Sequence, residues 1–124
     1  MTFARWTFRL AGIFGLLALA PQYFMESQLA REFPPPLAHP VFFYGFTGVA
    51  LAWQVAFLII AQDPRRYRPL MIAAMIEKFS FGIAAGALYF QQRIETPFLA
   101  AAMFDVLLGL LFVEAYRRSG RDLS

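Results

Sequence analysis

Apolar residues along the chain fall into four long blocks that are separated by short polar stretches. Each block is about as long as the roughly 20 residues that a helix needs to cross the hydrocarbon core of a bilayer. The pattern therefore predicts an all-α fold, a bundle of four transmembrane helices with antiparallel up-and-down connections. We expect these helices at about Trp6–Met25, Val41–Ala61, Leu70–Phe90 and Pro97–Tyr116.

Composition favours the membrane over a soluble fold. Hydrophobic residues make up 60% of the 124 positions and charged residues 15%, and a soluble core of this size cannot hide so much apolar surface. We therefore expect one integral membrane domain over residues 1–124. Its first helix is expected to be retained rather than cleaved as a signal peptide, because Pro21 directly follows the cleavage-like sequence Ala18–Ala20. Residues 26–40 are expected to form an outer loop in which Glu26–Glu32 can make a short helix before the Pro34–Pro36 run.

Arginines gather at one end of the predicted bundle. Basic residues in short loops stay on the cytoplasmic side of a membrane. We therefore predict a multi-pass protein of the bacterial cytoplasmic (inner) membrane with both termini, and the turn at Asp63–Pro69, in the cytoplasm. Two arginines, Arg31 and Arg93, fall on the other side, and the cytoplasmic set is Arg5, Arg9, Arg65, Arg66, Arg68, Arg117, Arg118 and Arg121.

The predicted third helix separates a bulky face from a face of small and charged residues. A bulky stripe is expected to contact lipid, and small residues let neighbouring helices approach closely. Charge that faces hydrocarbon costs several kcal/mol, so the charged face should contact protein. The bulky stripe is Ile72, Ile76, Phe79, Ile83 and Phe90, and the small pair on the other side is Gly82 and Gly86. Gly12 and Gly15 suit close packing of the first helix in the same way.

Four polar residues within the predicted spans form a candidate buried polar cluster: Gln54, Glu77, Lys78 and Asp105. At a rise of 1.5 Å per residue, Gln54 and Glu77 lie about 10–12 Å and Asp105 about 16 Å from the cytoplasmic ends of their helices. All four thus occupy one slab of the membrane. Intramembrane charges are a functional hypothesis by default, so the cluster is a candidate proton or ligand site. The alternative is structural, with Lys78 pairing with Asp105 or Glu77 to pin two helices together.

No residue set predicts catalysis or a cofactor. The chain has no Cys and one His, and we expect His39 to lie in a loop. We therefore expect no catalytic residue, no metal site and no cofactor. The leading prediction is a non-enzymatic accessory or subunit-type protein that contacts the lipid bilayer and a membrane-protein partner or a second copy of itself, but no nucleic acid. The alternatives are a small proton-coupled transporter or channel that uses Glu77 and Asp105, and then a membrane enzyme or binder of a lipid or quinone.

The turn Asp63-Pro64-Arg65-Arg66-Tyr67-Arg68-Pro69-Leu70-Met71, followed by Glu77-Lys78, resembles small uncharacterised bacterial four-helix membrane proteins that are loosely DoxX-like. The resemblance implies a bundle in the cytoplasmic membrane and, for some members, a subunit role beside oxidoreductases. It supplies no catalytic residue. In length and number of spans the chain also resembles small multidrug transporters. It lacks their acidic residue in the first helix, since no carboxylate lies between Arg9 and Met25.

Overall fold

The computed structural model describes residues 2–32 and 39–121, and within them every regular element is a helix. The all-α prediction is therefore confirmed. In chain order the elements are α1 (Thr2–Leu19), the 3-10 helix η1 (Ala20–Phe24), α2 (Glu26–Glu32), α3 (Pro40–Gln62), α4 (Leu70–Phe90) and α5 (Thr96–Arg121).

Four helical stretches in the described part are long and apolar enough to cross a membrane. They correspond to the four predicted blocks, and α1 and η1 together form the first of them, Thr2–Phe24. Helices satisfy their own backbone hydrogen bonds, which is the condition for spanning hydrocarbon. The chain therefore fits a multi-pass integral membrane protein.

Helices α1 and α5 run past the apolar blocks that predicted them. Helix α1 begins at Thr2 rather than Trp6, and α5 continues to Arg121 rather than ending at Tyr116. Glu114 pairs with both Arg117 and Arg118 on the next turn, and such pairs support a helix after it leaves the apolar layer. An apolar block thus indicates the stretch of a helix that is able to cross the lipid, and the helix itself extends further.

The predicted outer loop is partly helical. The short helix expected at Glu26–Glu32 is present as α2, so that prediction is confirmed. Pro21 lies in the first turn of η1, where its ring and its missing N–H disfavour continuation of the α-helical hydrogen bonds of α1. The Pro34–Pro36 run lies outside the described residues.

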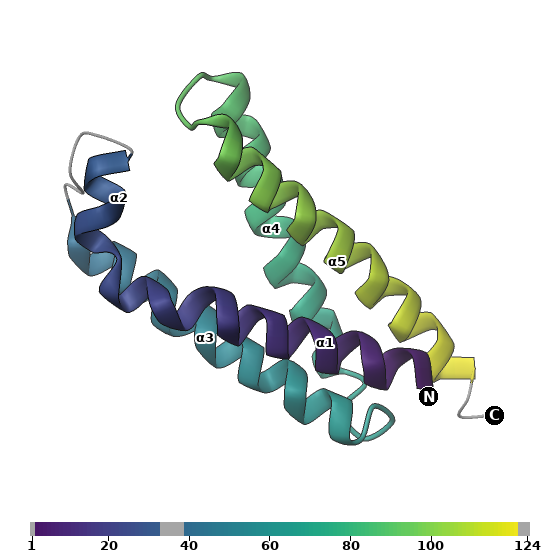
Figure 1. The fold of residues 1–124 in the computed structure, drawn as a ribbon. Helices are drawn as coiled ribbons and strands as arrows, with labels where there is room; N and C mark the ends of the chain where they lie inside the picture. The colour runs from purple at the N-terminus through teal and green to yellow at the C-terminus, as the bar shows by residue number, and fades with distance from the viewer. Residues whose placement is uncertain (1, 33–38, 122–124) are drawn as a thin grey trace.

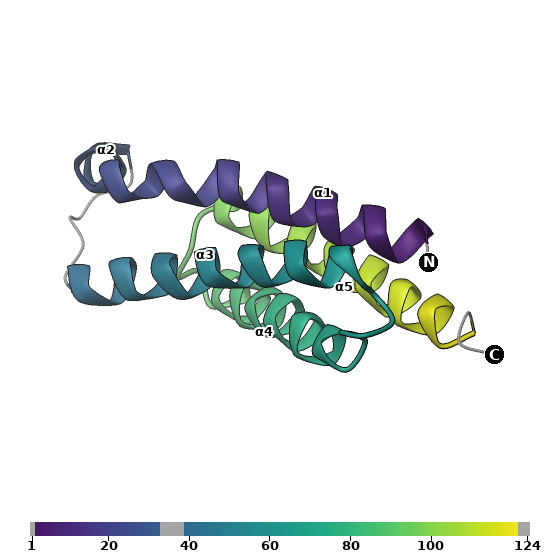
Figure 2. The same ribbon diagram turned by 90° about the horizontal axis from the view of Figure 1, so that it is seen from below.

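The spanning helices form two pairs that diverge like the arms of a V. Helix α1 lies along α3, α4 lies along α5, and contact between the pairs runs mainly through α1 and α5. The arms meet at the end that holds both termini and the 63–69 turn, and they separate toward α2 and the 91–95 turn (Figure 1). The view from below shows the same two pairs, with α1 beside α3 and α4 beside α5 (Figure 2).

An aromatic core holds the closed end of the V together. The rings of Phe8 and Phe112 are stacked with centroids 4.2 Å apart, and Phe57 meets Phe112 edge-on at 5.0 Å. These rings come from α1, α5 and α3, while α4 contributes the buried Met71 and Ala74. Aromatic pairs in these geometries stabilise by about 0.5–1.5 kcal/mol beyond the area they bury. All four spanning helices are therefore joined at this end.

Arg68 ties the turn between α3 and α4 to the last turns of α5. Its guanidinium donates hydrogen bonds to the Tyr116 carbonyl at 2.9 and 3.0 Å and to Ser119 Oγ at 3.2 Å. The same group lies 3.7 Å from the centroid of the Tyr116 ring. The sequence marked Arg68 only as one of the topology-setting arginines, and its contact with α5 is a finding of the structure.

The lipid-facing stripe of α4 is mostly as predicted. Ile72, Ile76, Ile83 and Phe90 are exposed, but Phe79 packs against α5, where a Cβ on Gly109 would lie 2.9 Å from its ring. The prediction for Phe79 was wrong because the missing side chain of Gly109 leaves room for an aromatic ring. Of the predicted small pair, Gly82 packs against Val106 of α5, whereas nothing lies within 4 Å of a Cβ placed on Gly86.

Candidate functional site

Three of the four predicted polar residues meet between α4 and α5, close to α3. The Lys78 ammonium of α4 lies 3.6 Å from Glu77 Oε2 and 3.5 Å from Asp105 Oδ1 of α5. It also lies 5.3 Å from the centroid of the Phe57 ring of α3. Lys78 therefore contacts groups on three helices, and one of its carboxylate partners lies on the neighbouring helix of its own pair.

The two carboxylates line a pocket between α3 and α4. The pocket has a volume of about 290 Å³, near the lower end of the range for small-molecule sites, about 300–1,000 Å³. Its walls are mainly aromatic and aliphatic, with Ser80 beside the acids, and its lining residues are Phe46, Val49, Ala50, Trp53, Glu77, Ser80, Phe81 and Asp105.

Exposure separates the base from the acids. The Lys78 side chain keeps 6% of its surface accessible, whereas Glu77 keeps 21% and Asp105 keeps 22%. The ammonium is thus enclosed behind the carboxylates, and the carboxylates reach the pocket. Two ionised carboxylates and one ammonium carry a net charge of −1. Within hydrocarbon such a surplus is costly, and either a proton on one carboxylate or a compensating positive group removes it.

Gln54 lies apart from these three residues. Its side chain is enclosed between α3 and α1, at 2% exposure, and its amide donates to the Ala50 carbonyl at 2.8 Å. A Cβ on Gly15 of α1 would overlap the Gln54 amide. The Gln54 Oε1 atom accepts no hydrogen bond from the described residues. The structure therefore assigns Gln54 to the α1–α3 contact, and the ion pairs of Lys78 do not include it.

Sequence reasoning found the charges of the pocket but missed its aromatic walls. Phe46, Ala50 and Trp53 recur at intervals of four and three residues along α3, which places them on one face. That spacing could have predicted a wall opposite Glu77. Apolar residues occupy nearly every position of α3, however, so that the lipid face and the pocket face have nearly the same composition.

The pocket offers little for covalent chemistry. The Ser80 hydroxyl donates to the Glu77 carbonyl of its own helix at 3.2 Å and not to a carboxylate that could serve as a base. Among the residues that the structure describes, no three His, Cys, Asp or Glu side chains lie close enough to hold a metal ion. What the arrangement can do is attract a positive group and surround an apolar body.

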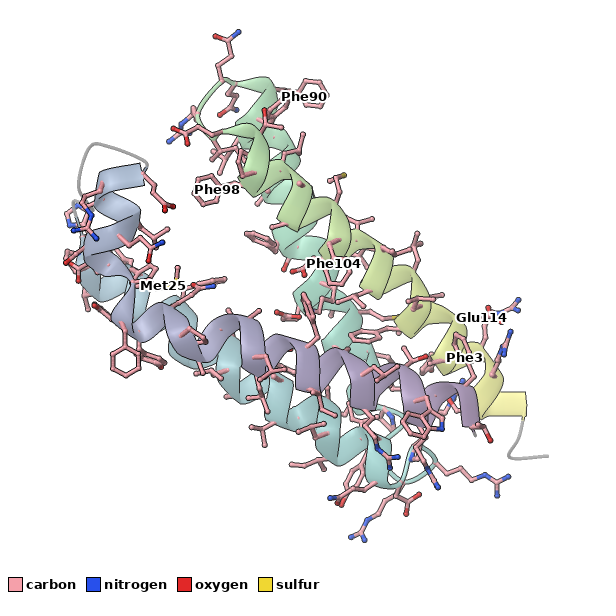
Figure 3. All side chains as sticks on the ribbon, in the orientation of Figure 1. Phe3, Met25, Phe90, Phe98, Phe104 and Glu114 are labelled. Carbon is pink, nitrogen blue, oxygen red and sulfur yellow. The ribbon has the colours of Figure 1, made fainter. Side chains whose placement is uncertain are left out.

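Figure 3 places the aromatic residues of α5 relative to the two arms. Phe98 and Phe104 extend from α5 toward the pair formed by α1 and α3 (Figure 3). The Phe104 ring reaches Phe14 of α1, with centroids 5.0 Å apart. The two arms are therefore still in contact at Phe104, through α1 and α5.

Comparisons of this chain with protein-family models, with curated proteins and with solved structures found no match. The likeness to DoxX-like proteins therefore stays a prediction.

Proposed function

We propose that the protein is a non-enzymatic subunit of the cytoplasmic membrane that holds an apolar, positively charged molecule between α3 and α4. The observation that carries this proposal is the position of Glu77 and Asp105, whose carboxylates line a pocket while Lys78 is enclosed behind them. A cation in the pocket would offset the surplus negative charge.

The pocket walls suit such a ligand. Phe46, Trp53 and Phe81 line the pocket beside the acids, and aromatic faces attract cations, most strongly when water is excluded. An apolar body would replace contacts that lipid tails otherwise make with these rings. The ligand class is therefore an amphiphile with a delocalised or quaternary positive charge.

The two tryptophans of the chain make this binding measurable. Trp53 lines the pocket and Trp6 lies on α1, outside it, so Trp6→Phe leaves one reporter at the site. We expect tetraphenylphosphonium, a lipophilic cation, to change Trp53 emission saturably in nanodiscs. Glu77→Gln combined with Asp105→Asn should abolish that saturable change, because it removes the charge that attracts the cation.

Matched controls separate binding in the pocket from partition into the membrane. Glu114→Gln removes a carboxylate from the α5 end, away from the pocket, and should leave the titration unchanged. Neutral triphenylphosphine oxide should give no saturable signal. Equal titrations with and without the two pocket carboxylates would contradict the proposal.

A small proton-coupled transporter is the second candidate, and one observation favours it. Glu77 Oε2 is buried and, apart from its ion pair with Lys78 at 3.6 Å, accepts no hydrogen bond from the described residues, so a proton can take the place of a missing donor. In this alternative, a pH gradient across liposomes that contain the protein would drive uptake of the bound cation in exchange for protons. Glu77→Gln would stop that uptake. Saturable binding without movement supports the subunit role.

A further inference from the structure

On the other side of the molecule, α1 and α5 leave an apolar groove of about 550 Å³. Aromatic and aliphatic side chains line it, among them Phe3, Trp6, Leu10 and Phe14 of α1 and Phe104 and Leu111 of α5. The contact between Phe14 and Phe104 closes its inner end. This groove shares no residue with the pocket between α3 and α4.

The groove is as long as one leaflet is thick. Its lining on α1 runs from Thr2 to Phe14, a rise of about 18 Å at 1.5 Å per residue. Half of a hydrocarbon core about 30 Å thick is about 15 Å. A chain lying in the groove would therefore run from the headgroup region to the middle of the bilayer, as one lipid acyl chain does.

The outer end of the groove is positively charged. The Arg118 guanidinium of α5 lies 4.2 Å from the centroid of the Phe3 ring, and that of Arg9 lies 4.9 Å from the Trp6 ring. Phe3 and Glu114 lie at the same end of the molecule (Figure 3). Glu114 is shared by Arg117 and Arg118, so two guanidinium groups meet one carboxylate there. Positive charge is left over beside two rings of the groove wall.

We infer that the groove binds one acyl chain of an anionic phospholipid, whose phosphate is held by Arg9 and Arg118. Basic pockets between transmembrane helices on the cytoplasmic side bind such headgroups. A zwitterionic lipid fills the groove equally well but brings no net charge to the arginines. The inference concerns α1 and α5 alone and does not depend on the function proposed above.

Trp6 lines the groove and can report on the lipid directly. Trp53→Phe leaves Trp6 as the single tryptophan, and lipids brominated on the acyl chain quench a tryptophan that they contact. In nanodiscs of mixed composition we expect phosphatidylglycerol to associate with Trp6 more than about tenfold more strongly than phosphatidylcholine, since each of the two arginines contributes about fivefold. Each of Arg9→Gln and Arg118→Gln should lower that preference about fivefold, the equivalent of one surface arginine.

Arg117→Gln is the matched control. It removes the same charge from the same turn of α5, but Arg117 contacts neither Phe3 nor Trp6 among the interactions of the described residues. A preference for phosphatidylglycerol that survives Arg117→Gln supports the groove site. Equal quenching by the two lipids, or an equal loss with Arg117→Gln and Arg118→Gln, would overturn it, because attraction would then be diffuse.

Discussion

Lys78 is the residue on which the candidate site depends. It is one ammonium facing two carboxylates, at 3.6 and 3.5 Å, so its loss leaves both acids without a partner. Breaking a buried ion pair from one side costs about 3–5 kcal/mol. We predict that Lys78→Met lowers the free energy of unfolding by an amount in that range, measured by denaturation in mixed micelles.

The partner substitutions sharpen this test. Asp105→Asn alone should cost less than Lys78→Met, because Glu77 still pairs with the ammonium. Adding Asp105→Asn to Lys78→Met should recover part of the loss, since one orphaned charge is then removed. A double variant as unstable as the sum of the two single variants would show that the residues do not interact.

At this scale the sequence predicted which charges meet but not where the amide lies. Glu77, Lys78 and Asp105 lie at similar depth on faces that were predicted to contact protein, and the structure brings these three together. Gln54 lies at a similar depth, yet its side chain turns to α1 because Gly15 leaves the room that its amide fills. The depth of a residue along its helix can be counted from the sequence. The neighbour that its side chain contacts depends on where another helix leaves space, here at Gly15 of α1.

At the scale of elements, glycines decide how closely the helices of each pair approach. A Cβ on Gly15 would overlap the Gln54 side chain, whereas a Cβ on Gly86 meets nothing within 4 Å. We predict that Gly15→Ala lowers the stability by about 1–3 kcal/mol, as overpacking does. Gly86→Ala should raise it by up to about 1 kcal/mol through helix propensity. Thermal unfolding followed by circular dichroism measures both.

These two variants are controls for each other. Both place the same methyl group in a transmembrane helix, so their difference isolates packing from propensity. Equal effects of Gly15→Ala and Gly86→Ala would contradict the close approach of α1 to α3.

The helices themselves could be predicted well from the sequence, and their ends less well. The predicted third helix, Leu70–Phe90, has the same bounds as the observed α4. Helix α5 exceeds its apolar block because Glu114 and the following arginines extend it.

The turn after α4 shows a cap that the sequence did not reveal. Gln92 has φ of 59°, and the N–H groups of Gln92 and Arg93 bond back to the Tyr89 and Leu88 carbonyls, a Schellman ending in which glycine is more usual.

At the scale of the whole molecule, the sequence did not predict that α1 pairs with α3 and α4 with α5. Four apolar helices can be arranged in several ways, and their similar compositions do not distinguish a compact bundle from two diverging pairs. The V form follows from contacts at the closed end, where Phe8, Phe57 and Phe112 gather. Both the pocket of Glu77 and Asp105 and the groove of Trp6 lie between the pairs, so both proposed sites depend on this arrangement.

We predict four membrane crossings, with the closed end of the V in the cytoplasm. The accessibility of single introduced cysteines tests this directly, because the chain has no native Cys. Ser27→Cys in α2 and Gln91→Cys after α4 should react with an impermeant maleimide in intact cells. Arg66→Cys, between α3 and α4, and Arg117→Cys, near the end of α5, should react only after the membrane is opened. Labelling of positions 66 and 91 from the same side would show that α4 does not cross the bilayer, and a fully inverted pattern would place both termini outside the cytoplasm.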